Sequence, residues 1–346
     1  MKILIIQQKM IGDVLTSTIL FEAIKEKHPN AELHYLINSH TSAVVQNNPY
    51  IDSLILFTPE IEKNNLKLWG FIKSIRSEKY DIVIDVYSKL SSNLISAFSN
   101  AKIKISYYKG YSSFIYNNKI KREKNIYTTT DRLQLLKPLG INKQNIKPKI
   151  YLTPNEILKS KIYLKRQHVN LKKTLFMISI LGSAKNKTYP IDYMAKLIDV
   201  IVEETKGQIL FNYIPSQISI VKNLYNCCKT ETKKYIFYNV YGKDLREFLT
   251  IAKHCNALIG NEGGAINIAK AINIPTFSIF SPWINKEGWN IFEDGEKYTS
   301  IHLKDLQPKL FENKTVKEIK KNIDFYYNAF DPELIIPKLK IFLKNF

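Results

Sequence analysis

The sequence predicts an α/β protein built from two Rossmann-like domains, and three observations support this. Short apolar runs alternate with amphipathic segments of about ten or more residues, which is typical of parallel sheets covered by helices on both faces. The alternation occurs once in each half of the chain. A length of 346 residues is sufficient for two domains with full cores. We therefore expect two domains that face each other across a cleft.

The first half begins with an apolar run, a turn and a segment whose apolar residues recur at helical spacing from Asp13 onward. Four further short apolar runs follow, with helical patterns between the later ones. The predicted strands are Lys2–Ile6, Glu32–Ile37, Ser53–Phe57, Ile82–Val86 and Ile103–Tyr107, and the predicted helices are Asp13–Lys27, Leu66–Ser77 and Leu90–Phe98.

Residues Gly110–Lys124 are polar, basic and rich in tyrosine, without clear periodicity. This composition predicts a long surface loop, which is either a ligand-binding or lid segment or plain disorder. A helix is expected at Tyr127–Leu139, and a linker rich in glycine, asparagine and proline at Ile146–Asn155. We place the first domain at residues 1–150 and the second at 151–330.

The second half repeats the alternation. The predicted strands are Leu175–Ile180, Gln208–Tyr213, Tyr235–Tyr238, Ala257–Ile259 and Thr276–Phe280, and the predicted helices are Ile191–Glu204, Gln217–Cys227, Lys243–His254, Gly263–Ile272 and Val316–Phe330. Residues Lys286–Lys309 are expected to be rich in loops. The segment 331–346 predicts a final amphipathic helix that either lies on an anionic surface or packs across the domain junction, and we favour packing.

The composition favours an anionic partner. Lysine and arginine total 51 against 31 aspartate and glutamate residues, which gives a formal charge of +20 spread along the chain. Nucleic acid, an anionic membrane surface and a phosphorylated substrate would each gain from this field, while a solvated lysine-rich surface is the alternative. Because the sequence has no arginine-rich run, zinc knuckle or RNP-like stripe, we expect no nucleic acid.

Other classes are excluded by what the sequence lacks. Three cysteines at Cys227, Cys228 and Cys255 provide neither a disulfide framework nor a zinc site. The N-terminal residues have no signal-peptide pattern, and no stretch approaches the length of a membrane span. We therefore expect a cytoplasmic protein, with peripheral contact to the inner membrane face as an extension of the charge argument.

A strand, a glycine-rich turn and a helix follow one another in NALIGNEGGAINIAKAINIP. In such a turn the backbone N–H groups and the positive end of the helix converge, and glycines leave room for a ligand. The turn Gly260–Gly264 is thus either a phosphate cradle or an ordinary tight βα turn.

Three turns are expected at the cleft because each follows a parallel strand: Gln7–Asp13, Leu181–Tyr189 and Gly260–Gly264. The middle turn offers the hydroxyl of Ser183 and the cation of Lys187, which suit a phosphate. An exposed basic loop is the alternative interpretation.

These segments resemble glycosyltransferase family 9, which comprises the ADP-heptose:lipopolysaccharide heptosyltransferases and their relatives. The resemblance covers nearly the whole chain in the same order. The matching segments are the opening strand with its Gly-Asp-Val turn, NPYID at Asn48–Asp52, YDIVIDVYSKLSSNLIS at Tyr80–Ser96, TTTDRLQLLKPLG at Thr128–Gly140, GSAKNKTYP, and the donor motif GNEGGAINIAKAINIPTFSIFSP.

The resemblance implies a GT-B fold and inverting, metal-independent transfer from a nucleotide-diphosphate sugar to a lipopolysaccharide or lipooligosaccharide core. It implies that Asp13 is the general base and that Lys187 contacts the donor diphosphate, so both are candidate catalytic residues. From position alone, Asp13 could instead be a helix N-cap. The candidate donor-binding residues are Gly182, Ser183, Asn261, Glu262, Gly263, Gly264 and Asn267, and the candidate acceptor-binding residues are Gln8, Lys9, Lys109 and Lys121.

The chain departs from the family pattern in the donor motif. Glu262 replaces the usual aspartate, Gly263 a serine or threonine, Ala265 a proline and Asn267 a histidine. Gln8 also stands where many members have a small hydroxyl residue. The resemblance therefore favours ADP-heptose as the donor, with another nucleotide sugar close behind.

The resemblance implies that no cofactor or metal is needed, and the lack of an Asp-x-Asp sequence agrees with metal-independent transfer. Two other classes stay open. A nicotinamide-dependent oxidoreductase is disfavoured because the first βα turn lacks GxGxxG. A non-catalytic anion-binding or nucleic-acid-binding protein would use the positive charge alone.

Overall fold

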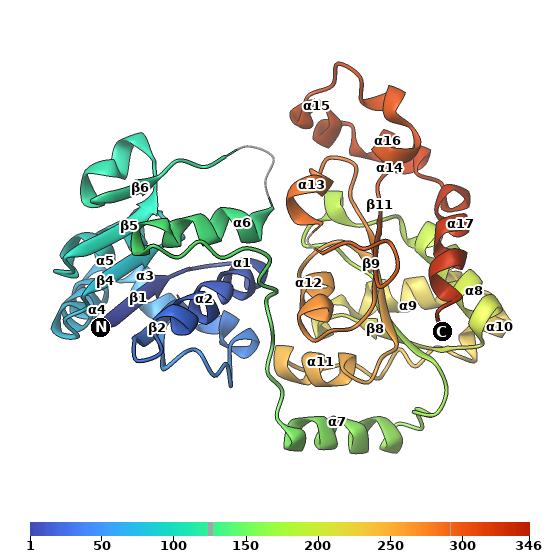
Figure 1. Cartoon of the computed structure of the whole chain (residues 1–346). Coiled ribbons are helices and arrows are strands. Elements are labelled where there is room, and N and C mark those ends of the chain that lie inside the picture. Colours follow the sequence, from blue (N-terminus) through green and yellow to red (C-terminus); the bar gives the residue numbers. More distant parts are fainter. Residues whose placement is uncertain (124–126, 291) are drawn as a thin grey trace. The chain divides into compact units, whose positions relative to one another are not determined.

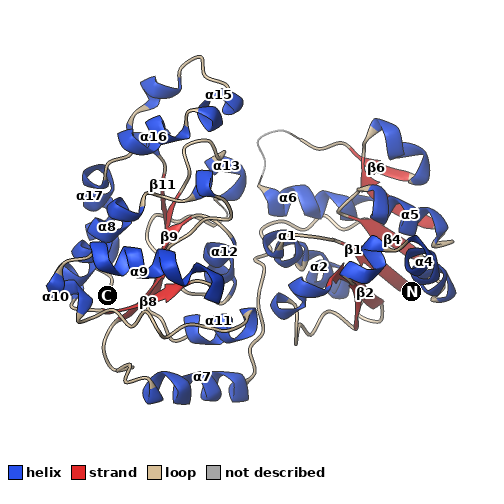
Figure 2. Ribbon diagram, turned by 180° about the vertical axis from the view of Figure 1, so that it is seen from behind, coloured by secondary structure: helices blue, strands red, loops and turns tan. Residues whose placement is uncertain are grey.

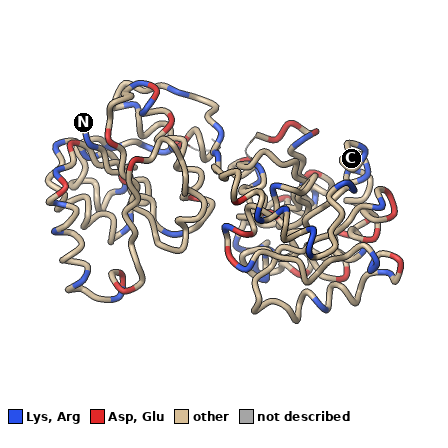
Figure 3. The backbone as a smooth tube through the Cα atoms, turned by 90° about the horizontal axis from the view of Figure 1, so that it is seen from below, with Lys and Arg blue, Asp and Glu red and all other residues tan. Residues whose placement is uncertain are grey.

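The computed structural model describes residues 1–123, 127–290 and 292–346. The chain divides into two compact units (Figure 1). The first unit contains Met1–Tyr151 and Glu287–Ile291, and the second contains Leu152–Lys286 and Phe292–Phe346. Lys and Arg are scattered over both units and do not gather in one tail (Figure 3).

The first unit contains a six-stranded parallel sheet in the order β3-β2-β1-β4-β5-β6, which confirms the predicted α/β class. α4 and α5 pack on one face, where their apolar side chains meet those of Leu4, Ile6 and Val83. α1, α2 and α6 contact one another on the other face (Figure 1). The strands are β1 (Lys2–Ile6), β2 (Glu32–Asn38), β3 (Ser53–Phe57), β4 (Ile82–Asp85), β5 (Ile103–Tyr107) and β6 (Asn118–Ile120).

The helices of this unit are shorter than predicted at two places. The helix expected at Asp13–Lys27 is broken at Thr18, whose hydroxyl donates to the carbonyl of Leu15 at 2.7 Å. The helix expected at Tyr127–Leu139 tightens into a 3₁₀ segment that contains Pro138. The helical segments are α1 (Ile11–Ser17), α2 (Ile19–Lys27), η1 (Ser39–Val44), α3 (Pro59–Lys63), α4 (Asn65–Ser77), α5 (Leu90–Phe98), η2 (Gly110–Ile115), α6 (Thr128–Leu133) and η3 (Gln134–Leu139).

The prediction of a long loop at Gly110–Lys124 is wrong for the part of this segment that the structure describes. This segment forms η2 and then β6, whose residues pair with β5 from Asn118 to Ile120. Periodicity could not reveal β6, because a strand of three residues with only one apolar side chain carries no alternating pattern. Lys124 lies outside the described residues.

The second unit contains a five-stranded parallel sheet in the order β11-β10-β9-β7-β8. Two predictions are corrected here. Tyr235–Tyr238 is not a strand and contributes only an isolated bridge between Ile209 and Ile236. The region expected to be loop-rich contains β11 at one edge of the sheet. The strands are β7 (Leu175–Ser179), β8 (Gln208–Asn212), β9 (Ala257–Asn261), β10 (Thr276–Ile279) and β11 (Tyr298–Ile301).

Helices cover both faces of the second sheet (Figure 2). α7 was not predicted, although Thr153 and Glu156 form a capping box at its start. The predicted helix Val316–Phe330 is broken at Asn322 into α15 and α16. The helical segments are α7 (Pro154–Arg166), η4 (Lys185–Lys187), α8 (Ile191–Thr205), η5 (Pro215–Gln217), α9 (Ile218–Cys227), α10 (Thr230–Lys233), α11 (Leu245–Ala252), α12 (Gly264–Ala271), α13 (Lys286–Trp289), α14 (Leu303–Leu306), η6 (Pro308–Phe311), α15 (Val316–Lys321), α16 (Ile323–Ala329) and α17 (Pro332–Leu343).

The final helix, α17, packs against α8 within the second unit. Its apolar face, with Ile335 and Leu339, is buried in the core of that unit, and Lys340 forms an ion pair with Glu204 at 2.8 Å. None of the helices in the described part of the chain is long and apolar enough to span a membrane.

Candidate functional site

In the second sheet, the strand order changes direction between β7 and β9. Open parallel sheets bind ligands at the carboxyl ends of the strands on either side of such a switch point. In this unit those ends lead into Ile180–Pro190 and Glu262–Gly263, which contain some of the predicted donor-binding residues, and the others lie at the end of β9 and in α12.

Asn261, the last residue of β9, joins these two loops. Its side-chain oxygen accepts from the backbone N–H of Tyr189 at 2.7 Å, and its side-chain nitrogen donates to the carbonyl of Ser179 at 3.0 Å. The residue is 1% exposed. Its amide therefore connects the end of β9 to β7 and to the loop that follows β7.

The loop after β7 is closed tightly around Lys187. A Cβ on Gly182 would lie 2.2 Å from the carbonyl oxygen of Lys187, so only glycine fits there. The carbonyl of Asn186 accepts from Ser281 Oγ at 2.8 Å and from Trp283 Nε1 at 2.9 Å. These contacts fix the backbone at both sides of Lys187, while Ser183 stays exposed at the tip of the loop.

Two lysines favour the charged form of the Glu262 carboxylate. Burial raises the pKa of Glu262, and the charges of Lys187 and Lys270 oppose that rise. The ammonium of Lys187 also lies 5.2 Å from the ring centroid of Trp283. Burial lowers the pKa of Lys270 to about 8, against the effect of Glu293 and other carboxylates. Sequence analysis missed Lys270, although a lysine within an apolar helix was a visible signal.

The turn after β9 leaves open space at the start of α12. Gly260 has φ of +131°, and a Cβ there would lie 2.4 Å from the carbonyl oxygen of Ser179. By contrast, within the described part of the chain and apart from the neighbouring residues and the helix backbone, no atom lies within 4 Å of a Cβ built on Gly263 or Gly264. Because the N-cap of α12 is Gly263, which has no side chain to accept from them, the first N–H groups of this helix suit an anion. Asn267, the remaining predicted donor-binding residue, lies half-buried in α12.

The first sheet changes direction between β1 and β4, and side chains join the loops that follow them. The hydroxyl of Ser91 donates to the side-chain oxygen of Gln8 at 2.6 Å, and Gln8 is 2% exposed. The buried side chain of Gln8 therefore connects the segment after β1 to the segment after β4. Its neighbour Lys9 is exposed, with a left-handed φ of +69°.

Asp13 lies in the first turn of α1, which follows β1 after a short loop. The N-cap of α1 is Met10, so the alternative that Asp13 is the N-cap is wrong. Its Oδ1 accepts from Arg132 NH2 at 2.7 Å, and the same guanidinium donates through Nε to Ser17 Oγ at 2.8 Å. The Arg132 side chain is 7% exposed and that of Asp13 is 34% exposed. A buried arginine thus holds a carboxylate that solvent can still reach.

A fully buried carboxylate, Asp85, ends β4. It accepts from the hydroxyl of Tyr116 at 2.6 Å and from the backbone N–H of Ser88 at 2.7 Å. Burial raises the pKa of Asp85. Sequence analysis gave it no role, because a carboxylate at the end of a strand does not reveal a tyrosine that pairs with it from another element.

The two predicted acceptor-binding lysines differ in their surroundings. The ammonium of Lys109 donates to the carbonyl of Ser88, and burial lowers the pKa of Lys109, assisted by the charges of Lys89 and Arg122. Lys121 is exposed directly after β6. Asp13, Gln8 and Lys109 are thus all near the carboxyl edge of the first sheet, since each follows β1 or β5 by a few residues.

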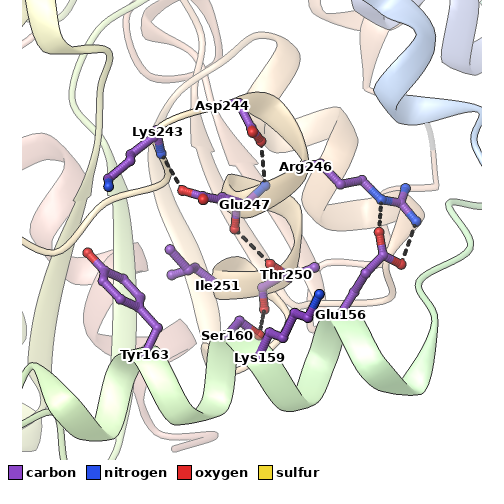
Figure 4. A pocket seen from close by; sticks show the side chains of 10 residues that line it. All are labelled: Glu156, Lys159, Ser160, Tyr163, Lys243, Asp244, Arg246, Glu247, Thr250 and Ile251. Carbon is purple, nitrogen blue, oxygen red and sulfur yellow. Dashed lines mark hydrogen bonds and ion pairs between the residues drawn. The ribbon is translucent and has the colours of Figure 1, made fainter.

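A pocket of about 330 Å³ lies between α7 and α11 in the second unit (Figure 4). Its polar groups bind mostly one another: Arg246 donates to Glu156 at 2.6 Å, and Ser160 donates to the carbonyl of Thr250 at 3.2 Å. The ion pair with Arg246 lowers the pKa of Glu156 to about 2. None of the predicted site residues lines the pocket. We therefore interpret its polar residues as contacts that join α7 to α11.

This chain is similar to known proteins in both sequence and fold. The sequence matches glycosyltransferase family 9 (heptosyltransferase) over residues 68–298. It is 25% identical over 299 residues to lipopolysaccharide heptosyltransferase 1 of Campylobacter coli, covering 81% of this chain and 84% of that protein. The fold is similar to the crystal structure of a family 9 glycosyltransferase from Veillonella parvula, with a TM-score of 0.86, 18% identity, and 100% and 98% of the two chains covered.

The fold is also similar to E. coli heptosyltransferase WaaC with ADP. That similarity has a TM-score of 0.65 and 14% identity, and it covers 95% of this chain and 99% of WaaC. Because the family match extends over more than half of the chain, it identifies the family directly. The chain belongs to glycosyltransferase family 9, the heptosyltransferase family, and is a glycosyltransferase.

Proposed function

We propose that this enzyme transfers a sugar, with heptose favoured, from a nucleotide-diphosphate sugar to a lipopolysaccharide or lipooligosaccharide core, with inversion and without a metal ion. The observation that carries the proposal is that Lys187 and the start of α12 both follow strands of one switch point, where the charge of Lys187 acts on Glu262 just before that helix. The names of its relatives support the acceptor class, since the Campylobacter coli protein is a lipopolysaccharide heptosyltransferase.

The donor diphosphate suits the second unit. Lys187 and the first N–H groups of α12 would bind its oxygens, and they stabilise most strongly the charge that grows as the diphosphate leaves. Glu262, half-buried after β9, would accept a hydrogen bond from a donor hydroxyl. The ADP in the E. coli WaaC structure makes an adenine nucleotide the first choice.

The base suits the first unit. Asp13 would take the proton of the acceptor hydroxyl while that oxygen forms a bond to C1 of the donor sugar. The bond from C1 to the diphosphate oxygen breaks, and the nucleoside diphosphate leaves with the electron pair. Arg132 keeps Oδ1 in place, and among the described residues no hydrogen-bond donor meets Oδ2, which is the oxygen we assign to the proton.

The donor sugar is the finer part of the proposal. Glu262 reaches one methylene farther than the aspartate of the family pattern, and Asn267 replaces its histidine, so the pocket for the sugar has different hydrogen-bonding groups. A family 9 transferase that uses a non-heptose nucleotide sugar is therefore the second candidate.

On the acceptor side, Lys9, Lys109 and Lys121 give the carboxyl edge of the first sheet a positive charge that suits an anionic, lipid-linked saccharide. We place the protein in the cytoplasm, in peripheral contact with the inner face of the inner membrane.

A thermal-shift screen against ADP-, UDP-, GDP- and CMP-sugars tests the donor. We expect one nucleotide series to raise the melting temperature, because a ligand that binds only the folded state stabilises it. Turnover with that donor and a core saccharide should continue in EDTA. Absence of any shift together with absence of nucleoside diphosphate release would contradict the proposal.

A further inference from the structure

The stretch from the end of β4 to Arg122, just after β6, carries positive charge only. Residues 86–122 contain seven lysine or arginine residues and no aspartate or glutamate. The stretch includes β5, η2 and β6, and β6 is an edge strand of the first sheet (Figure 1). A continuous run of this kind attracts an anionic surface and repels a cationic one.

The 3₁₀ helix η2 presents aromatic side chains to solvent. Residues three apart in a 3₁₀ helix lie on the same face. Tyr111 and Phe114 are three apart and are 69% and 85% exposed, whereas Ser112 on another face is buried. Tyr108, just before η2, is more than half exposed as well. A soluble protein gains nothing from leaving such rings in water unless a partner covers them.

This aromatic face is held in a fixed position. Tyr116, which ends η2, is buried and donates to the carboxylate of Asp85, and β6 pairs with β5 directly after it. The exposed rings therefore sit on an anchored turn, so their burial against a partner would cost little conformational entropy.

Cations flank the exposed rings along the chain. Lys109 precedes η2, Lys119 is the central residue of β6, and Lys121 follows β6 directly; Lys119 and Lys121 are both exposed. Arg122 stacks over the ring of Tyr107 with 3.8 Å between its guanidinium carbon and the ring centroid. Aromatic rings at the level of lysine and arginine side chains are typical of proteins that lie on a lipid headgroup layer.

Aliphatic side chains extend this surface. Met10 and Leu90 are strongly exposed, and each follows a strand, β1 or β4, at the same carboxyl edge of the sheet from which Tyr108 emerges. Stacking on nucleobases would use the rings but would leave these two side chains without a partner. Acyl chains bury all of them.

We propose that η2, β6 and the exposed side chains of Met10 and Leu90 form a surface that docks on an anionic phospholipid bilayer. Tyr108, Tyr111 and Phe114 enter the headgroup region, while the surrounding cations bind lipid phosphates. The proposal rests on the proposed function, because a lipid-linked acceptor places the enzyme at a membrane.

Vesicle flotation with the full chain tests this surface. Phosphatidylcholine vesicles that contain phosphatidylglycerol should bind the protein in a salt-sensitive way, and pure phosphatidylcholine vesicles should bind it weakly. The double variant Tyr111→Ser, Phe114→Ser should bind anionic vesicles about tenfold more weakly. The matched control is Leu66→Ser in α4, since Leu66 is 84% exposed in the same unit. Both variants should keep the wild-type melting temperature.

Transfer to a core saccharide without its lipid separates this proposal from the proposed function. The double variant should transfer to that saccharide at the wild-type rate. Equal vesicle binding by the double variant and the Leu66→Ser control would overturn the membrane surface. It would also be overturned if the double variant lost binding to RNA and kept wild-type binding to anionic vesicles. Loss of transfer to the lipid-free saccharide would also overturn it. If wild-type protein transferred no sugar but bound vesicles through Tyr111 and Phe114, the proposed function would fail and the surface would stand.

Discussion

In the first unit, side chains join the loops at the switch point, whereas in the second unit glycines add close backbone contacts to the hydrogen bonds of the Asn261 side chain. Gln8 and Ser91 link one pair of loops through their side chains, and Arg132 holds Asp13 beside them. In the other pair, Gly182 and Gly260 allow backbones to approach closely. The first arrangement fixes the orientation of one reactive side chain. The second leaves open N–H groups for a ligand to occupy.

This difference matches the two tasks of a transfer reaction. A base acts on one proton and must be oriented precisely, so a buried guanidinium that holds one carboxylate oxygen is suitable. A diphosphate carries several oxygens, and a helix end with a nearby lysine can bind them in a space free of Cβ atoms. The predictions below separate the two tasks.

The largest effect is expected at Asp13. Asp13→Asn keeps an oxygen that accepts from Arg132 but removes the proton acceptor, so kcat should fall about a thousandfold. Initial rates with saturating donor measure this. The melting temperature monitors the fold, because Arg132 loses its anionic partner. A rate within a few fold of wild type would exclude Asp13 as the base.

In the second unit, the stability cost of replacing a glycine by alanine should depend on the space around its Cα atom. Gly260→Ala places a Cβ against the carbonyl of Ser179 at a positive φ, so unfolding free energy should fall by about 3 kcal/mol. Gly264→Ala has open space and serves as the control, with less than about 1 kcal/mol expected. Urea unfolding of both variants checks this, and equal losses would contradict the contrast between closed and open glycines.

Arg132 should act through Asp13. Arg132→Lys keeps the charge but cannot bind Asp13 and Ser17 together, so kcat should fall about tenfold to a hundredfold while the KM for donor stays unchanged. Arg132→Met should lose more activity than the lysine variant. A variant that raised the donor KM and left kcat intact would place Arg132 in donor binding instead.

The smallest effect concerns Lys270. Its folded-state pKa of about 8 lies below the ordinary value of 10.5, so between these pH values the unfolded chain binds a proton that the folded chain does not. Stability should therefore rise with pH across this window because of this group. Urea unfolding of the wild type and Lys270→Met should show the smaller rise in the variant, and parallel pH curves would contradict it.

The sequence predicted the elements whose signal is local. Ten strands were expected and nine form, because strands such as β1 and β9 are short apolar runs between turn residues. The turn at Gly260–Gly264 was visible because glycine marks positions that need close approach or a positive φ. β6 was missed because it is three residues long and mostly polar.

The site was predictable in part for the same reason. Asp13 and Lys187 occur in segments that resemble family motifs, so they could be named from the sequence. The contact between Arg132 and Asp13 joins residues 119 positions apart, and no local pattern indicates it. Lys270 gains its role from burial near Glu262 and Glu293, which only the folded chain creates.

The central claim is that the two units divide the reaction, with donor binding by the second and proton removal by the first. Calorimetric titration of Asp13→Asn and Lys187→Met with the nucleoside diphosphate selected by the donor screen tests it most directly. We predict that Lys187→Met binds about tenfold more weakly than wild type and that Asp13→Asn binds with unchanged affinity. Equal weakening in both variants, or none in Lys187→Met, would contradict this division.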